Sequence, residues 1–153
     1  MEEVEYHSVL VAFEDDEFSE EMVATAATLA AGKRGCILVL SLVNVPANLA
    51  LDARMDDAEA EAQSKIERAK LICGRRVSGK VVRVRPGQAA QAIIERARQI
   101  DAEAVVLQLT YRDGRPLYGQ TLRGVLAARP TRVIVSANPG GTGAKAGRLA
   151  PAR

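Results

Sequence analysis

The sequence is poor in the side chains that most enzymes use for chemistry. Its 153 residues include one histidine, two cysteines, no tryptophan, three tyrosines and two phenylalanines. With His7 as the only imidazole, a multi-histidine metal site is excluded, and a Ser-His-Asp or Cys-His arrangement would depend on that one residue. We therefore expect a protein that is not an enzyme and that holds no metal.

The chain also lacks signals for disulfides, export and membrane insertion. Cys36 and Cys73 have no paired spacing of a redox motif or a zinc site, and we interpret both as reduced thiols in the core. Residues 1–5 are acidic where an export signal is basic. The apolar runs at 23–31 and 37–45 are too short to cross a bilayer. The sequence predicts a cytoplasmic chain without direct membrane insertion.

Charge is abundant but unevenly divided along the chain. Hydrophobic residues make 48% and charged residues 26%, as in an ordinary folded domain. Residues 1–61 carry 14 acids and 3 bases and residues 62–153 carry 5 acids and 18 bases, which gives net charges of −11 and +13. The arginines are spaced as helix faces and strand edges, without the series of interleaved aromatics that base stacking would require. We expect complementary solvated faces and no nucleic-acid partner.

Short apolar runs alternate with amphipathic segments along most of the chain. The apolar runs are at 7–13, 36–45, 79–85, 103–109 and 131–136. Apolar residues recur at helical spacing in 19–31, 55–72, 89–100 and 122–126. Runs that are apolar on both faces indicate parallel strands covered on both sides. The pattern predicts an α/β domain, in which a parallel sheet lies between two helix layers.

In such a sheet, ligands bind at the carboxyl ends of the strands, where the strand order reverses. We expect the turn at 13–16, the end of the second strand at Leu42 and the loop at 107–121 to meet there. After Ala137 the chain becomes rich in glycine. We therefore predict one folded domain over residues 1–137 and a flexible tail over 138–153.

Several segments, taken in their order and spacing, resemble the universal stress protein family. They are Val9–Glu14, Arg85–Ile94, Ala102–Leu107 and Gly119–Val135. The resemblance implies a regulatory or stress-response domain with an adenine nucleotide alpha hydrolase-like fold, a three-layer α/β/α sandwich whose five parallel strands have the order 3-2-1-4-5. It also implies a homodimer that forms through the last strand, with Val133, Ile134 and Val135 at the dimer edge.

Two further stretches are similar to the stress-protein-type domains that are fused to amino-acid permeases. These stretches are Ala12–Asp16 and Val45–Leu49. This second resemblance implies a regulatory module with a transporter as its partner.

Family members that bind nucleotides resemble one another in a motif, G-x-x-G followed by nine residues and G-[ST], whose backbone amides hold the phosphates. In this chain Gly119 matches the last glycine, but no pair of glycines stands at the required distance before it. Gln120 replaces the Ser or Thr, Thr121 comes one place late, and Glu14 stands where the family has aspartate. The resemblance thus predicts a degenerate motif that does not bind ATP in the usual pose.

The loop before Gly119 carries side chains that the motif does not have. Leu109 or Tyr111 would obstruct the approach of a phosphate to the backbone. Arg112 and Arg115 either replace the missing amides with bidentate contacts to a phosphate or carboxylate, or are simply solvated.

Two functions stay open from the sequence. One is a signalling protein that binds ATP, AMP, another adenine nucleotide or a cyclic dinucleotide, and the other is a dimeric interaction module without nucleotide. No cofactor is certain. The candidate ligand-binding residues are Ala12, Phe13, Glu14, Leu42, Leu107, Gln108, Arg112, Arg115, Gly119, Gln120 and Thr121.

Overall fold

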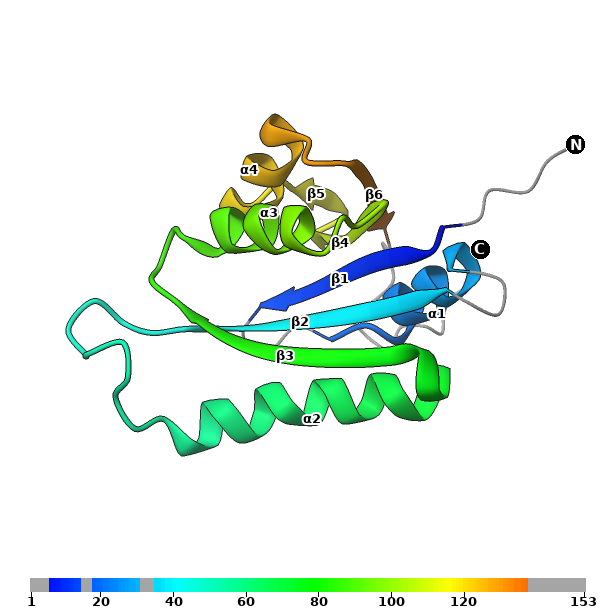
Figure 1. The fold of residues 1–153 in the computed structure, drawn as a ribbon. Helices are drawn as coiled ribbons and strands as arrows, with labels where there is room; N and C mark the ends of the chain where they lie inside the picture. Colours follow the sequence, from blue (N-terminus) through cyan, green and yellow to red (C-terminus); the bar gives the residue numbers. More distant parts are fainter. Residues whose placement is uncertain (1–5, 15–17, 31–34, 138–153) are drawn as a thin grey trace, which may run out of the picture.

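The computed structural model describes residues 6–14, 18–30 and 35–137 (Figure 1). In chain order the elements are β1 (Ser8–Glu14), α1 (Glu20–Leu29), β2 (Cys36–Asn44), α2 (Asp56–Cys73), the short helix η1 (Gly74–Arg76), β3 (Val77–Val84), α3 (Ala89–Gln99), β4 (Ala104–Arg112), β5 (Arg115–Leu117), α4 (Gln120–Ala128) and β6 (Arg132–Ala137). The predicted turn at 15–16, the predicted end of the first helix at 31–34 and the predicted tail at 138–153 lie outside the described residues.

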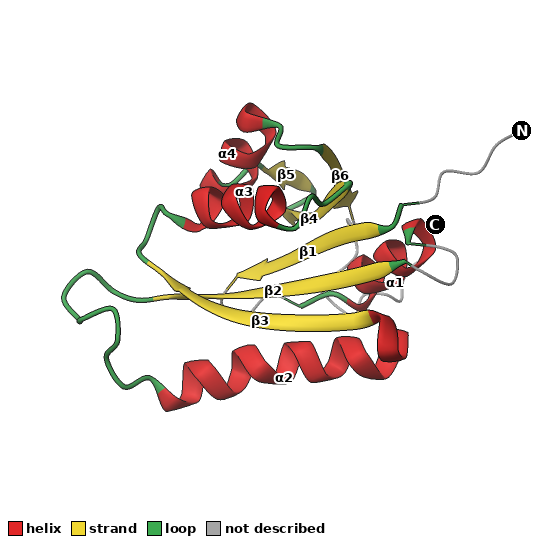
Figure 2. Ribbon diagram, in the orientation of Figure 1, coloured by secondary structure: helices red, strands yellow, loops and turns green. Residues whose placement is uncertain are grey.

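The central sheet has the order β3-β2-β1-β4-β6, and its strand pairs are all parallel. Helices α1 and α2 cover one face, and α3 and α4 cover the other (Figure 2). The predicted α/β/α sandwich and the predicted order of five parallel strands are confirmed. The last of them is β6 rather than a fifth strand, because a short antiparallel strand, β5, precedes it and pairs with β4.

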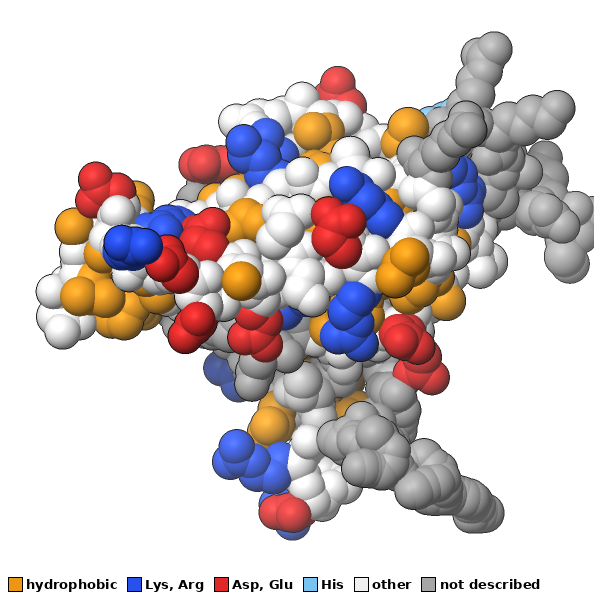
Figure 3. All heavy atoms as spheres, turned by 90° about the horizontal axis from the view of Figure 1, so that it is seen from below, with side chains coloured by type: hydrophobic (Ala, Val, Ile, Leu, Met, Phe, Trp, Pro, Cys, Tyr) orange, Lys and Arg blue, Asp and Glu red, His pale blue; other side chains and the backbone are white. Residues whose placement is uncertain are grey.

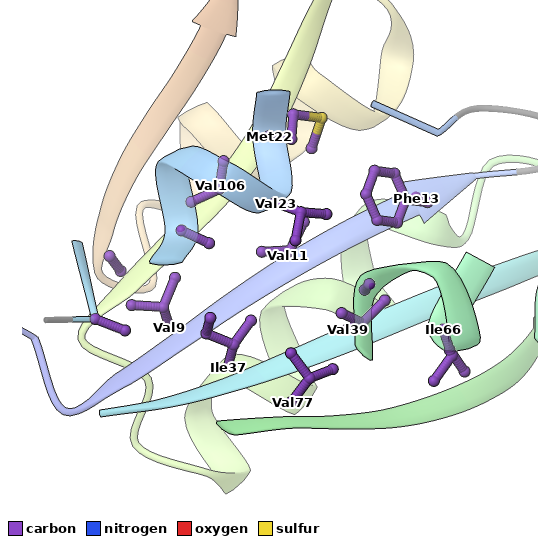
Figure 4. Close-up of a cluster of buried hydrophobic side chains, with 14 of the residues drawn as sticks. Val9, Val11, Phe13, Met22, Val23, Ile37, Val39, Ile66, Val77 and Val106 are labelled. Atoms are coloured by element: carbon purple, nitrogen blue, oxygen red, sulfur yellow. The ribbon is translucent and has the colours of Figure 1, made fainter. Parts of the chain in front are cut away.

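Alternate residues of β1 enter two separate hydrophobic cores. Val9, Val11 and Phe13 are fully buried against α1 and α2 (Figure 4). Leu10 and Ala12 are buried in a second core with α3 and α4. Because a slip of one residue would exchange the two faces, this packing fixes the register of β1. It also fixes where the strand ends, with Glu14 at the carboxyl edge of the sheet.

The two cysteines differ in their surroundings. Cys73 is half-buried at the end of α2, and burial raises the pKa of its thiol while nearby Arg76 lowers it to a smaller extent. Cys36 is exposed at the start of β2. The prediction of a core position is therefore wrong for Cys36, which precedes the apolar residues of its strand and does not reach the interior.

The acidic and basic halves of the sequence are interleaved in space. Glu59 of α2 pairs with Arg83 of β3 at 2.7 Å, and Glu20 of α1 lies 3.9 Å from Arg68 of α2. Seen from the α2 side, acidic and basic side chains alternate on the surface (Figure 3). The charge asymmetry of the sequence thus becomes a set of local pairs on this face. None of the helices in the described part of the chain is long and apolar enough to cross a membrane.

Candidate functional site

A pocket of about 220 Å³ opens at the carboxyl ends of β1, β2 and β4. The turn before α3, β5 and the first turn of α4 complete its wall. The residues that line it are Ala12, Phe13, Glu14, Leu42, Gly87, Ile93, Leu107, Gln108, Thr110, Leu117, Gly119, Gln120, Thr121 and Leu122. The position agrees with the rule that open parallel sheets bind ligands beyond the carboxyl ends of their strands.

Most of the sequence-predicted site residues come together at this pocket. Nine of the eleven line it, and Arg112 and Arg115 do not. Gly87, Thr110 and Leu117 are on the wall although sequence reasoning did not select them as site residues. The binding of a ligand by these residues stays a prediction.

The carboxylate of Glu14 connects three elements at the mouth of the pocket. The Thr121 hydroxyl, in the first turn of α4, donates a hydrogen bond to Oε1 of Glu14 at 2.8 Å. The Asn44 side-chain amide, at the end of β2, donates to Oε2 at 3.0 Å. Glu14 and Thr121 are 107 positions apart in the chain. Their contact draws α4 against the end of β1 and holds the carboxylate on the pocket wall.

The first turn of α4 presents backbone amides near the pocket. Gly119 is the N-cap residue, and no described side chain caps the helix. The Arg123 amide bonds to the Gly119 carbonyl at 3.0 Å, whereas the three preceding amides, by helix geometry, have no acceptor within the helix. A helix start of this kind favours negative charge nearby. Here the nearby negative charge is the carboxylate of Glu14.

A β-hairpin occupies the segment that was expected to be an irregular loop. Strand β4 continues past Leu109 to Arg112, and β5 returns beside it. Asp113 and Gly114 form the two-residue turn, with φ angles of 53° and 77°. Both angles are positive, as a type I′ turn requires, and Asp-Gly is a strong sequence signal for that turn. This signal, present in the sequence, would have predicted the hairpin.

The hairpin changes what the backbone can bind. Thr110 is opposite Leu117, Tyr111 opposite Pro116 and Arg112 opposite Arg115. Backbone groups that pair across a ladder are not available to a phosphate. The chain therefore has a paired ribbon at the position where a phosphate-binding loop needs unpaired amides.

The predicted obstruction by Leu109 or Tyr111 is wrong. The Leu109 side chain is buried in the second core, and Tyr111 packs against that core from the same side of the strand. Because side chains alternate along a strand, it is Gln108 and Thr110 that line the pocket.

Arg112 and Arg115 lie next to the turn, at the far end of the hairpin, and both are exposed. They form the pair that flanks Asp113 and Gly114, with Arg112 before the turn and Arg115 after it. The hairpin carries them away from the pocket wall, because three residues of β4 that were expected in a loop extend the strand instead. The solvated alternative fits this placement better than a contact to a ligand in the pocket.

Gly87 lies opposite Gln120 across the pocket. Its φ of 86° is one that side-chain-bearing residues rarely adopt, and a Cβ atom there would lie 3.4 Å from Nε2 of Gln120. Gly87 stands in the turn after Pro86, where the positive φ favours glycine, and its backbone faces the Gln120 amide.

Charged side chains are few on the described part of the pocket wall. Among the lining residues that the structure describes, Glu14 is the only Asp, Glu, Lys or Arg. Within the ranges that the structure describes, no group of three or more His, Cys, Asp or Glu side chains is placed to hold a metal ion. The wall otherwise offers apolar side chains, hydroxyls and the two amides of Gln108 and Gln120.

The family model that matches this chain describes the universal stress protein family and covers residues 5–136. Among solved structures, the chain is similar to a universal stress protein from Archaeoglobus fulgidus, with a TM-score of 0.60, 21% identity and coverage of 84% of this chain and 91% of that one. No curated protein sequence is significantly similar to the chain.

Two of the similar structures contain nucleotides. The universal stress protein from Archaeoglobus fulgidus in complex with dAMP has a TM-score of 0.59 and 22% identity, covering 84% of this chain and 95% of that one. A universal stress protein in complex with cAMP has a TM-score of 0.61 and 19% identity, covering 86% and 97%. At these identities the likeness shows the fold.

Proposed function

The chain belongs to the universal stress protein family, and from that premise we propose that it is a regulatory domain whose pocket binds an adenine-containing ligand without the usual triphosphate pose. The observation that carries this proposal is the pocket itself. It lies at the carboxyl ends of β1, β2 and β4 and includes the first turn of α4. Similar structures of the same fold hold dAMP and cAMP.

The polar groups of the wall suit a purine nucleoside. Gln108 and Gln120 each present an amide with both donors and acceptors, and glutamine is a residue that pairs with the N6 and N7 atoms of adenine. A carboxylate after a parallel strand, such as that of Glu14, is a group that accepts hydrogen bonds from ribose hydroxyls. Leu42 and Leu107 provide apolar surface for the base.

A triphosphate is a poor fit for the same pocket. Its volume of about 220 Å³ is below the roughly 300 to 1,000 Å³ of drug-sized sites. The lining residues within the described ranges include no lysine or arginine, and the hairpin pairs the backbone beside them. Each of these features removes a source of affinity for the β- and γ-phosphates.

A thermal-shift panel tests the proposal. Adenosine, AMP, cAMP, ATP and a cyclic dinucleotide are added separately at millimolar concentration, and we expect at least one of the small adenine compounds to raise Tm more than ATP does. A ligand at 100 times its Kd adds about 2.7 kcal/mol to the free energy of unfolding. The absence of a shift with every compound would contradict the proposal.

A pair of tryptophan variants assigns any shift to this pocket. Gln120→Trp fills the pocket from the exposed first turn of α4, and we expect it to abolish the shift. Arg123→Trp introduces the same residue on the same helix at an exposed position outside the pocket wall, and it should retain the shift.

We also propose that two copies associate through β6. This strand pairs with β4 on one side and is at the edge of the sheet, and Val133, Ile134 and Val135 are only half-buried there. A half-exposed apolar edge strand is a ready partner for a second copy. Light scattering should give the mass of a dimer at tens of micromolar, and the mass of a monomer would contradict pairing.

The alternative function, an interaction module that acts on a transporter, draws on a different part of the surface. Leu49 and Leu51, in the segment after β2, are 38% and 45% exposed. A cytoplasmic location and a transporter partner remain proposals from the sequence. The nucleotide panel separates this alternative from the first function, because an interaction module without a ligand predicts no shift.

A further inference from the structure

Building on the proposed function, we infer that Glu14 makes the pocket selective for the uncharged nucleoside adenosine over its phosphate esters. The reason is the position of its carboxylate, which lies at the start of α4 where a bound phosphate would otherwise gain most from the helix.

The carboxylate is held in place from two sides. Thr121 is the second residue of α4, and its hydroxyl bonds to Oε1, while the Asn44 amide bonds to Oε2. All three side chains are half-buried. The side chain of Glu14 is therefore part of the pocket wall, and moving it away would break both hydrogen bonds.

A phosphate that entered the first turn of α4 would meet this carboxylate at close range. Like charges repel, and the repulsion is stronger in a partly buried site than in bulk water. Among the described residues that line the pocket, none is a lysine or arginine that could compensate. The nearest arginines of the hairpin, Arg112 and Arg115, are not on the wall.

Adenosine avoids this repulsion and keeps the favourable contacts. Its ribose hydroxyls are hydrogen-bond donors, which a carboxylate accepts, and its base can pair with the amides of Gln108 or Gln120. The carboxylate of Glu14 thus favours adenosine in two ways. It accepts hydrogen bonds from the ribose hydroxyls, and it repels the phosphate of the competing ligand.

Isothermal titration calorimetry of the full chain with adenosine, AMP and ATP tests the inference. We expect the wild type to bind adenosine at least tenfold more tightly than AMP. Glu14→Gln keeps the shape of the side chain and removes its charge, and should lower the adenosine-to-AMP affinity ratio at least fivefold. Glu61→Gln makes the same change in net charge at an exposed position of α2, and should leave the ratio unchanged.

A second variant keeps the inference testable if Glu14→Gln does not fold. Thr121→Val removes the hydroxyl that holds Oε1, which lets the carboxylate turn away from α4, and should lower the ratio at least twofold.

The outcomes separate the inference from the proposed function. Failure of the wild type to bind any compound of the thermal-shift panel would overturn the proposed function and the inference with it, whereas binding of cAMP or a cyclic dinucleotide without adenosine would overturn the inference alone. Two results would contradict selectivity by Glu14 and leave the proposed adenine pocket unaffected. One is a wild type that binds AMP as tightly as adenosine, and the other is the same adenosine-to-AMP affinity ratio in Glu14→Gln as in Glu61→Gln.

Discussion

Two connections leave the same edge of the sheet and are built in opposite ways. The segment 45–55, after β2, has no regular strand or helix and is held by two arginine side chains, one in β3 and one directly after it. Arg83 donates to the carbonyls of Leu51 and Ala53, and Arg85 donates to those of Pro46 and Leu49. The segment 110–119, which contains the end of β4, the turn and β5, is held by its own backbone, because its two arms pair as a hairpin.

The difference determines what each connection can offer a partner. Arginines satisfy the backbone of 45–55 from one side, and apolar side chains gather on the surface at this projecting end of the molecule (Figure 3). The hairpin pairs its amides internally and contributes Thr110 and Leu117 to the pocket wall. The first connection is therefore a surface for contacts, and the second limits the ligand of the pocket.

Removing the side-chain support of 45–55 should have the largest effect on stability. Arg83→Met deletes the ion pair with Glu59 and the hydrogen bonds to two carbonyls, and we expect a loss of about 2 to 3 kcal/mol in the free energy of unfolding. Chemical denaturation measures it. Arg54→Met is the control, since its pair with Asp56 is largely exposed and should be worth less than about 1 kcal/mol. Equal losses in the free energy of unfolding for the two variants would contradict the claim that Arg83 supports the segment 45–55.

The turn of the hairpin should be the next most sensitive point. Gly114 has a φ of 77°, so Gly114→Val is expected to destabilise the chain by about 1 to 2 kcal/mol and to weaken adenosine binding through β5. Gly119→Ser is the matched control for stability alone, because the φ of Gly119 is −69°, which any residue adopts, and serine is a good N-cap. If Gly114→Val melts at the wild-type temperature, the hairpin is not rigid.

The parallel sheet and the place of the pocket were predictable because each depends on local patterns. Alternation of apolar runs with helical spacing dictates the layers, and the strand order then brings Phe13, Leu42 and Leu107 to one edge. The hairpin has a local signal in Asp113 and Gly114, but the phosphate-loop spacing of the family falls on the same segment and predicts a loop. Consequently Arg112 and Arg115 were expected near the ligand and lie at the hairpin tip.

The hydrogen bond between Glu14 and Thr121 could not be predicted from the sequence, for a different reason. The sequence indicates both residues as candidates, but their hydrogen bond depends on how α4 packs against β1. No periodicity or spacing encodes the distance between side chains that are 107 positions apart. Such a contact follows only from the assembled tertiary structure.

A third variant probes the junction between the two connections. Asn44 ends β2, just before the segment 45–55, and donates to Glu14 on the pocket wall. Asn44→Asp places a second carboxylate against the first, and we expect a loss of about 1 kcal/mol in the free energy of unfolding, larger at low ionic strength. Asn48→Asp, exposed in the same segment, should change stability by less than about 0.5 kcal/mol. Denaturation at two salt concentrations checks both values.

The smallest effect is expected at the hairpin tip. The double variant Arg112→Ala and Arg115→Ala removes two exposed cations that do not line the pocket, so stability should change by less than about 1 kcal/mol and adenosine affinity by less than twofold. A tenfold loss of adenosine affinity in calorimetry would show that the arginines at the hairpin tip contact the ligand. It would contradict the claim that the hairpin contributes only Thr110 and Leu117 to the pocket.

The binding of an adenine compound at the ends of β1 and β4 is tested most directly by backbone amide shifts. In ¹⁵N-labelled protein titrated with adenosine, we expect the largest changes at Glu14, Gln108, Gln120 and Thr121, with little change at 46–53 or at the turn of the hairpin. Changes centred on 46–53, or none at a saturating concentration, would contradict the assignment of this pocket as the ligand site.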